Sequence, residues 1–322
     1  MAMKAAAPNP ASTTSARADI SFTPEPTLVH DRVIEWFEEH ARTLPWREPD
    51  CTPWGVMVSE IMLQQTPVVR VLPRWQEWMR RWPRPADLAA APVAEILRAW
   101  DRLGYPRRAL RLQAAAQAMV DDHGGEVPGT ADELRRLPGV GEYTAAAVAC
   151  FAFNQPEVVV DTNIRRVHAR AFTGHALPGK TYTSAQRRLA HDLMPATASD
   201  DGATACAWNA SVMELGALIC TARAPQCEVC PVADLCAWRT AGSPAPTEEQ
   251  QTKGQAWAGT DRQVRGAIMA ALRTSAAVPR AELLDGLALP EASAQQRSRC
   301  LDSLITDGLA AQAGDRVSLP GA

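Results

Sequence analysis

The chain has 322 residues, 46% of them hydrophobic, which is enough for one large or two medium domains with real cores. No apolar run approaches membrane-spanning length, and the N-terminal segment lacks the apolar stretch of a secretory signal. The net charge of -3 and the pI near 6.1 are not typical of a nucleic-acid binder, so that function would need local basic patches.

The predicted elements are helices along nearly the whole chain. We expect a disordered leader over residues 1–27, rich in Ala, Ser, Thr and Pro, and then an amphipathic helix to about Arg42. Further helices are expected near residues 53–66, 70–83, 87–104, 109–124, 163–172, 182–194 and 205–219, with a helix, hairpin and helix over 130–153. No alternating strand pattern appears before residue 300, so the predicted fold class is all-α.

A Gly/Ser/Pro/Gln-rich linker over residues 240–260 leads to a small module over residues 261–322. The module is predicted to hold helices over Gln263–Arg273, Arg280–Gly286 and Ala294–Asp307, followed by a β-hairpin that turns at Gly314-Asp315. This order is winged-helix-like. Its seven Arg and seven acidic residues cancel, so a packing or partner-binding role is at least as well supported as DNA contact.

Four of the eight cysteines form a compact loop with the spacing C-x6-C-x2-C-x5-C: Cys220, Cys227, Cys230 and Cys236. Without an export signal we expect a reducing, cytoplasmic location, where clustered thiols indicate a metal site rather than disulfides. Structural zinc sites usually combine two short-spaced pairs, whereas this loop has one short pair and two longer arms. The pattern favours one 4Fe-4S cluster, with zinc as the alternative. The other cysteines are predicted to be buried or incidental: Cys51, Cys150, Cys206 and Cys300.

Two carboxylates are candidates for chemistry. Glu60 lies in an apolar helical stretch, so it is either turned out to solvent or buried with a raised pKa. Asp161 begins a helix, where Asp is a favoured N-cap, and Arg165 one turn later is a possible partner. If both act in catalysis, a protonated Glu60 and an ionised Asp161 would form the acid and the anion that cleave a glycosidic bond. The sequence does not show that the two side chains meet.

A Pro-Gly-Val-Gly turn between two helices, at residues 138–141, has the form of a helix–hairpin–helix. Glycine lets backbone N–H groups reach a phosphate without reading bases, although an ordinary helix–helix turn is the alternative. Three arginine clusters, at residues 107–111, 135–136 and 165–170, either support DNA contact or form solvated faces. The polar Gln64-Gln65-Thr66 suits probing of bases, and Tyr105 at a turn suits an intercalating wedge.

Together these stretches resemble the helix–hairpin–helix base-excision DNA glycosylases with an iron–sulfur cluster, and among them the MutY-type adenine DNA glycosylases. The motifs that carry the resemblance are LPWR (44–47), SEIMLQQT (59–66), LGY (103–105), LPGVGEYTA (137–145), VDTNIRRV (160–167) and the cysteine loop (220–236). They span roughly residues 30–238.

The resemblance implies two α-helical lobes with the active site in the cleft between them. The six-helix lobe would comprise about residues 52–160, and the second lobe would combine the N-terminal helix over 28–42 with residues 161–239. Double-stranded DNA would be the partner, and adenine opposite 8-oxoguanine or guanine would flip into the cleft. The protein is expected to be monomeric and to act in the cytoplasm at the nucleoid.

The resemblance also implies roles for individual residues. Glu60 would protonate adenine at N7 and later activate water, and Asp161 would stabilise the sugar cation, with Tyr143 and Asn163 as supports. Gln65 and Tyr105 would wedge beside the lesion. The remaining expected DNA-contacting residues are Thr66 and Leu103 beside the wedge, Leu137, Gly139, Val140 and Gly141 in the hairpin, and Arg47.

Tyr143 separates this interpretation from endonuclease III-like enzymes, which carry a Schiff-base lysine at that position and cleave the strand. Tyrosine cannot form an imine, so we expect a monofunctional glycosylase. The alternatives are a bifunctional glycosylase/lyase and a non-catalytic iron–sulfur protein that binds lesions. Many MutY-type enzymes carry a large Nudix-like C-terminal domain that recognises 8-oxoguanine, and residues 261–322 are too few for it. Recognition of 8-oxoguanine would have to come from the Gln65/Tyr105 side or from a different kind of module.

Overall fold

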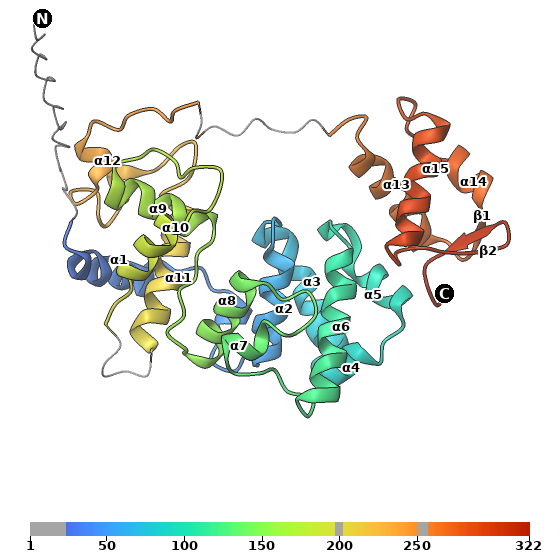
Figure 1. Cartoon of the computed structure of the whole chain (residues 1–322), viewed down its shortest axis with the longest axis horizontal. Helices are drawn as coiled ribbons and strands as arrows, with labels where there is room; N and C mark the ends of the chain where they lie inside the picture. The colour runs from blue at the N-terminus through green and yellow to red at the C-terminus, as the bar shows by residue number, and fades with distance from the viewer. Residues whose placement is uncertain (1–23, 197–201, 249, 251–256) are drawn as a thin grey trace, which may run out of the picture.

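The computed structural model describes residues 24–196, 202–248, 250 and 257–322, and it is helical almost throughout (Figure 1). The α-helices are α1 Pro26–His40, α2 Pro53–Leu63, α3 Val68–Arg81, α4 Pro85–Ala89, α5 Val93–Trp100, α6 Arg107–Asp122, α7 Ala131–Leu134, α8 Glu142–Phe153, α9 Thr162–Thr173, α10 Ser184–Asp192, α11 Ala203–Leu218, α12 Ala237–Thr240, α13 Asp261–Thr274, α14 Arg280–Asp285 and α15 Ala294–Thr306. Three 3₁₀ turns are η1 Pro45–Arg47, η2 Asp101–Leu103 and η3 Cys227–Val229. The all-α prediction is confirmed.

One predicted helix, over residues 87–104, is wrong because it is divided into α4, α5 and η2. Pro92 is the N-cap of α5 with extended backbone (φ −59°, ψ 135°). A proline disfavours helical backbone in the residue before it, which explains the break after α4. Asp101 then has a positive φ of 45° at the end of α5.

The C-terminal module has the predicted helices and hairpin, and one strand that the sequence did not indicate. That strand, β1 (Val278–Pro279), pairs antiparallel with β3 (Arg316–Ser318), which also pairs with β2 (Ala311–Ala313). The sheet order is therefore β1-β3-β2, and the expectation of no strand before residue 300 is wrong by this two-residue piece.

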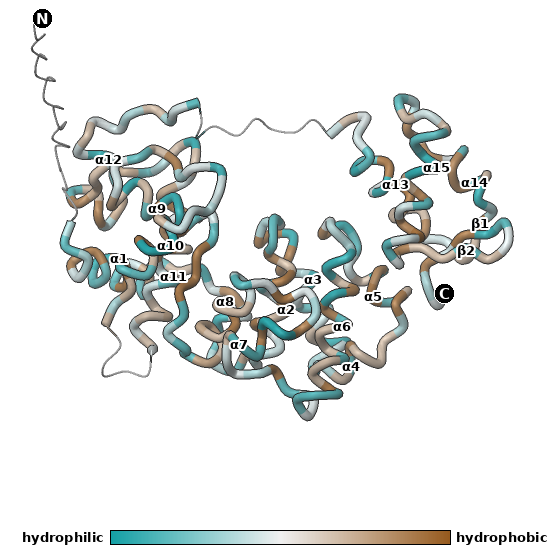
Figure 2. The backbone as a smooth tube through the Cα atoms, in the orientation of Figure 1, coloured by the Kyte–Doolittle hydropathy of each residue, from teal (hydrophilic) through white to brown (hydrophobic). Residues whose placement is uncertain are grey.

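Two hydrophobic cores share helix α8. Ala145 and Val148 pack into a core formed mainly by α2 to α8, whereas Ala147 and Cys150 pack into a core formed with α1, α9 and α11. Figure 1 shows the two groups of helices side by side, and Figure 2 shows hydrophobic residues concentrated in α2 and α8. A helix covered on both sides has no polar stripe, which explains the run of small apolar residues in α8.

A third core joins the C-terminal module to α5. Ala94 and Leu97 of α5 are buried among residues of α13, α15 and β3. The Nε of Arg273 donates a hydrogen bond of 3.0 Å to the carbonyl oxygen of Leu97. Arg107 also forms an ion pair of 3.3 Å with Asp307. The module is therefore packed against the lobe that contains α2 to α8 (Figure 1).

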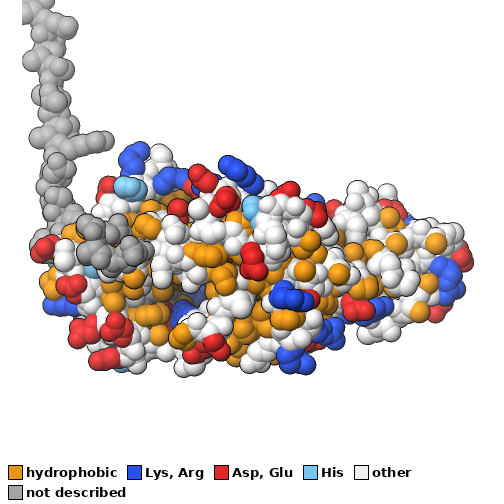
Figure 3. All heavy atoms as spheres, turned by 90° about the horizontal axis from the view of Figure 1, so that it is seen from below, with side chains coloured by type: hydrophobic (Ala, Val, Ile, Leu, Met, Phe, Trp, Pro, Cys, Tyr) orange, Lys and Arg blue, Asp and Glu red, His pale blue; other side chains and the backbone are white. Residues whose placement is uncertain are grey.

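The surface carries charges of both signs. On the face shown in Figure 3, acidic and basic side chains are interspersed with apolar ones and form no continuous basic stripe. This agrees with the net charge of -3. None of the helices in the described ranges is long and apolar enough to cross a membrane.

Candidate active site and cysteine loop

Glu60 lies on the buried helix α2, which begins where the Thr52 side chain accepts a hydrogen bond from Gly55 N and Pro53 occupies the first turn. Glu60 is 7% exposed, so it is buried rather than turned to solvent. Burial raises its pKa to about 7, although a hydrogen bond from Tyr143 opposes this. The charge of Asp161 raises the pKa of Glu60 further, and that of Arg47 lowers it.

Tyr143 lies in the first turn of α8, directly after the hairpin. Its hydroxyl donates a hydrogen bond of 3.0 Å to Oε2 of Glu60. Burial raises the pKa of Tyr143 well above its usual value, and the nearby charges of Glu60 and Asp161 add to that shift. The fold thus brings together Glu60, Tyr143 and Asp161, which the sequence could not place relative to one another.

Asp161 is the N-cap of α9, as predicted. Its carboxylate accepts hydrogen bonds of 2.7 Å from Ile164 N and from Asn163 Nδ2. Burial raises the pKa of Asp161, and these hydrogen bonds oppose the shift. Burial thus raises the pKa of both carboxyls, and the expectation of a protonated Glu60 beside an ionised Asp161 stays a prediction. The suggested pairing with Arg165 is wrong: its guanidinium donates to Gly179 O, Thr181 O and Gln186 Oε1.

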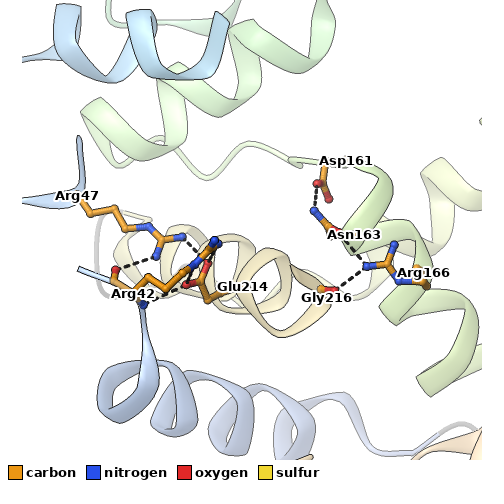
Figure 4. Close-up of polar contacts among 7 residues, drawn as sticks. All are labelled: Arg42, Arg47, Asp161, Asn163, Arg166, Glu214 and Gly216. Carbon is orange, nitrogen blue, oxygen red and sulfur yellow. Dashed lines mark hydrogen bonds and ion pairs between the residues drawn. The ribbon is translucent and has the colours of Figure 1, made fainter. Parts of the chain in front are cut away.

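The orientation of Asn163 is set by Arg166, which the sequence placed in a cluster of basic residues. Arg166 Nη2 donates to Asn163 Oδ1 at 2.8 Å and to Gly216 O at 2.6 Å, so the Asn163 amide nitrogen faces Asp161 (Figure 4). A Cβ at Gly216 would lie 2.7 Å from the Cβ of Asn163. Gly216 on α11 therefore allows α9 to approach closely enough for this hydrogen-bond chain.

A buried ion-pair cluster forms a second polar centre on α11 (Figure 4). Glu214 is 0% exposed and accepts hydrogen bonds from Arg42 Nε at 2.7 Å and Arg47 Nη2 at 3.0 Å. Burial alone would raise the pKa of Glu214, but the two guanidinium groups lower it to about 2. Arg47 is thus engaged inside the protein, and its contact with DNA stays a prediction.

The predicted wedge residues lie on two loops, Gln64–Thr66 and Leu103–Tyr105, which we call the wedge loops. Gln65 and Tyr105 are exposed, whereas Thr66 and Leu103 are buried behind them. The Thr66 hydroxyl donates to the Leu103 carbonyl oxygen at 3.1 Å, so the two loops are directly joined. Gln65 and Tyr105 have positive φ angles of 55° and 46°.

The predicted hairpin joins α7 to α8. Leu137 and Val140 are buried and anchor it, whereas Gly139 and Gly141 are exposed. Gly139 has φ 77°, and a Cβ there would lie 2.6 Å from the Cβ of Arg111. The turn therefore requires glycine both for its backbone conformation and for space.

The predicted basic cluster at residues 165–170 is wrong as a surface patch, because Arg166 and Arg170 are buried and donate hydrogen bonds inside the protein. In the cluster at residues 107–111, Arg108 is buried in the same way, whereas Arg107 and Arg111 are exposed. The pair Arg135-Arg136 is exposed. Counting charged residues along the chain overstated the basic surface, because it could not show which guanidinium groups face inward.

The cysteine loop surrounds one cavity, which all four predicted ligands line together with Arg170 and Trp238. Arg170 Nη1 lies 3.4 Å from Cys220 Sγ and also donates to Thr221 O at 2.7 Å. Four thiols with a neighbouring guanidinium suit an anionic cluster.

The cysteine loop and the Asp161 network share one side chain. Arg166, which orients Asn163, also donates from Nε to the carbonyl oxygen of Cys220 at 2.6 Å. The signal for this role was present in the sequence as the second arginine after Asp161-Thr162-Asn163. The neighbouring residues favour a surface charge at Arg166, because nothing nearby in the sequence indicates the distant carbonyl groups to which it donates.

Known protein families match both the segment that carries Glu60, Tyr143 and Asp161 and the cysteine loop. A family model described as HhH-GPD superfamily base excision DNA repair protein matches residues 58–191. The iron-sulfur binding domain of endonuclease III matches residues 220–236, the span of the four cysteines. Among solved structures, a thermostable thymine-DNA glycosylase has a TM-score of 0.57 at 27% identity, covering 67% of this chain and 97% of that one.

Two curated relatives match nearly the whole chain. The adenine DNA glycosylase of Mycobacterium tuberculosis is 47% identical over 306 residues, which are 92% of this chain and 97% of that protein. The adenine DNA glycosylase of Mycolicibacterium smegmatis is 47% identical over 291 residues, which are 90% of this chain and 95% of that protein. At these coverages the similarity extends into the C-terminal module.

Proposed function

The chain belongs to the adenine DNA glycosylases of the helix–hairpin–helix base-excision repair superfamily, and we propose that it removes adenine mispaired with 8-oxoguanine or guanine in double-stranded DNA. The observation that supports this most directly is the grouping of buried Glu60 with half-buried Tyr143 and Asp161. Adenine removal is hydrolysis of an N-glycosyl bond, and an acid beside an anion is the arrangement that such hydrolysis needs.

In the proposed reaction Glu60 acts first as the acid. Because burial raises its pKa to about 7, about half of the Glu60 carboxyls are protonated at neutral pH, and the protonated form donates its proton to N7 of the flipped adenine. The N-glycosidic bond breaks, its electron pair leaves with adenine, and positive charge develops at C1′ of the sugar. The Asp161 carboxylate stabilises that charge. Ionised Glu60 then takes a proton from the water that attacks C1′, which restores the acid.

The protein is an iron–sulfur protein with one 4Fe-4S cluster, and we propose Cys220, Cys227, Cys230 and Cys236 as its ligands. When bound, the cluster would order the loop, and it would supply no acid or base to the reaction. On the protein side, Arg170 holds the loop through Thr221 O, and Arg166 connects Cys220 O to Asn163.

DNA is proposed to bind with Gly139 and Gly141 of the hairpin at a phosphate, since both glycines are exposed while their neighbours anchor the turn. Gln65 and Tyr105 would enter the duplex beside the mispair. They are the exposed members of the two wedge loops, which supports this role. We also propose a monomer that acts in the cytoplasm at the nucleoid, and light scattering of the purified protein would test the monomer.

The experiment that tests the function uses duplexes with A opposite 8-oxoguanine, A opposite guanine, A opposite thymine, or thymine glycol. Products are compared with and without alkali. We expect adenine loss from the first two duplexes, with strand breaks appearing mainly after alkali. Breaks without alkali would support the bifunctional alternative. Binding without base loss would support the lesion-binding alternative.

Replacing Tyr143 with phenylalanine should move the pH dependence of excision to higher pH. The Tyr143 hydroxyl lowers the pKa of Glu60 by donating to its carboxylate, so the pKa of Glu60 should rise when that hydrogen bond is lost. Because the reaction needs protonated Glu60, the rate falls as pH rises through its pKa. The single-turnover rate measured from about pH 5 to 9 should therefore fall later in the variant.

The matched control is Tyr182→Phe, because the Tyr182 ring contacts Arg165 and Arg187 and Tyr182 is not among the groups that shift the pKa of Glu60. Its pH profile should coincide with that of the unmodified protein. A Tyr143→Phe profile that falls at the same or a lower pH would show that this hydrogen bond does not lower the pKa of Glu60.

A further inference from the structure

Arg108, in the first turn of α6, is a buried cation without an acidic partner. It is 8% exposed, and none of the salt bridges found across the described ranges includes it. Its guanidinium instead lies over the rings of Trp100 and Tyr105, 5.2 Å and 5.6 Å from their centroids. A buried charge usually persists only where other groups compensate it closely.

The compensation comes from the two wedge loops and the end of α2. One terminal nitrogen, Nη1, donates to Ile61 O at 2.8 Å and Gln64 O at 2.6 Å. The other, Nη2, donates to Thr66 Oγ1 at 3.2 Å and Gly104 O at 3.1 Å. Additional contacts reach Met62 O at 3.3 Å and Leu103 O at 3.4 Å. One rigid planar group therefore spans both loops.

The loops that Arg108 spans hold uncommon backbone conformations. Gln65, Gly104 and Tyr105 all have positive φ, and two of them carry side chains that disfavour it. Such conformations persist only when surrounding contacts determine them strongly. The carbonyl groups of Gln64 and Gly104, each next to an exposed wedge residue, are both bound by Arg108.

We propose that Arg108 is a positioning residue that sets the spacing of Gln65 and Tyr105, and so determines how well they separate the target adenine from the base opposite it. The proposal rests on the proposed function, in which these two side chains enter the duplex. Arg108 touches no substrate in this scheme. It also binds the carboxyl end of the helix that carries Glu60, so the test must separate a wedge effect from an effect on the acid.

The neighbouring Arg107 provides a matched control. It lies on the same turn of α6, but it is exposed and pairs with Asp307 of the C-terminal module. Arg107→Met and Arg108→Met therefore remove the same chemical group one position apart. Only the second removes the bridge between the wedge loops.

The experiment compares two duplexes under single-turnover conditions with the full chain. In one, adenine lies opposite guanine; in the other, it lies opposite an abasic spacer, where adenine still flips but no base pair has to be opened. Arg108→Met should slow excision about 100-fold on the first duplex, as expected for side chains misplaced by about 1 Å. On the second duplex it should slow excision by less than about 10-fold. Arg108→Lys should be intermediate, because an ammonium cannot span both loops. Arg107→Met should match the unmodified protein on both.

Equal slowing of Arg108→Met on both duplexes would overturn the proposal, because it would place the effect at Glu60. Unchanged rates would overturn it as well. If Arg108→Met does not fold, Thr66→Val takes its place, since it keeps the shape and removes an acceptor of Arg108; the same contrast between duplexes is then expected. If the unmodified protein removes no adenine, the proposed function fails independently of Arg108.

Discussion

Glu60→Gln is expected to lower the single-turnover rate of adenine excision by about 10³-fold, within the range of a lost general acid. The glutamine has nearly the same shape, and its carbonyl oxygen can still accept the hydrogen bond from Tyr143 that Glu60 Oε2 accepts. The change therefore removes the proton and little else. Duplex binding, measured separately, should be nearly unchanged, because Glu60 is buried on α2. A rate within about tenfold of the unmodified protein would contradict the assignment.

The same variant should be more stable than the unmodified protein at alkaline pH. Burial raises the pKa of Glu60 from 4.5 to about 7, so the folded state resists its ionisation. The associated stability is fully present below about pH 4.5 and is lost as pH rises through about 7. Glutamine does not ionise, so Glu60→Gln should gain about 3 kcal/mol over the unmodified protein at pH 8, and little at pH 5. Urea unfolding at the two pH values measures the difference. A gain in stability that is the same at both pH values would contradict a raised pKa of Glu60.

Asp161→Asn is expected to lower the excision rate by about 10³-fold for two reasons that act together. The negative charge that stabilises the sugar cation is lost. In addition, the new amide nitrogen would face Asn163 Nδ2, which donates to Asp161 at 2.7 Å, so two donors would meet. Asn163 cannot rotate its amide without losing the hydrogen bond from Arg166 Nη2.

The control for Asp161→Asn is Thr162→Ala, at the adjacent exposed position. Its rate and its duplex binding should match those of the unmodified protein. Asp161→Asn should bind mispaired DNA while excising slowly. Undiminished excision by Asp161→Asn would exclude the proposed mechanism, whereas loss of both binding and excision would indicate a disturbed cleft instead.

Helices and caps were predictable because their signals are local. Thr52 and Asp161 cap their helices through contacts three residues away, and Asn154 ends α8 in a left-handed conformation. The proline break before α5 was missed, although its signal is also local. The meeting of Glu60 with Tyr143 was not predictable from residue patterns, because the positions are 83 residues apart and only the packing of α2 on α8 joins them.

The arginines were the least predictable residues of the site. Arg108 and Arg166 lie in clusters that indicate basic surface, and Arg47 was expected to contact DNA. In the folded protein they bind buried oxygen atoms: the carboxylate of Glu214, the wedge-loop carbonyl groups and the carbonyl of Cys220. Those acceptors come from other segments, up to 167 residues away, so no local pattern announces them. Resemblance to a family marked some of these positions without indicating that they face inward.

The sharing of α8 between two cores has a consequence for how the chain unfolds. Ala145 and Ala147, two residues apart, each complete a different core, so melting α8 exposes apolar surface in both lobes at once. Hydrogen exchange of the α8 amides should therefore occur only through the global opening of the two lobes together. We therefore expect the two lobes to unfold as a single cooperative unit joined by the helix that also carries Tyr143, so that neither lobe unfolds while the other keeps its part of the site.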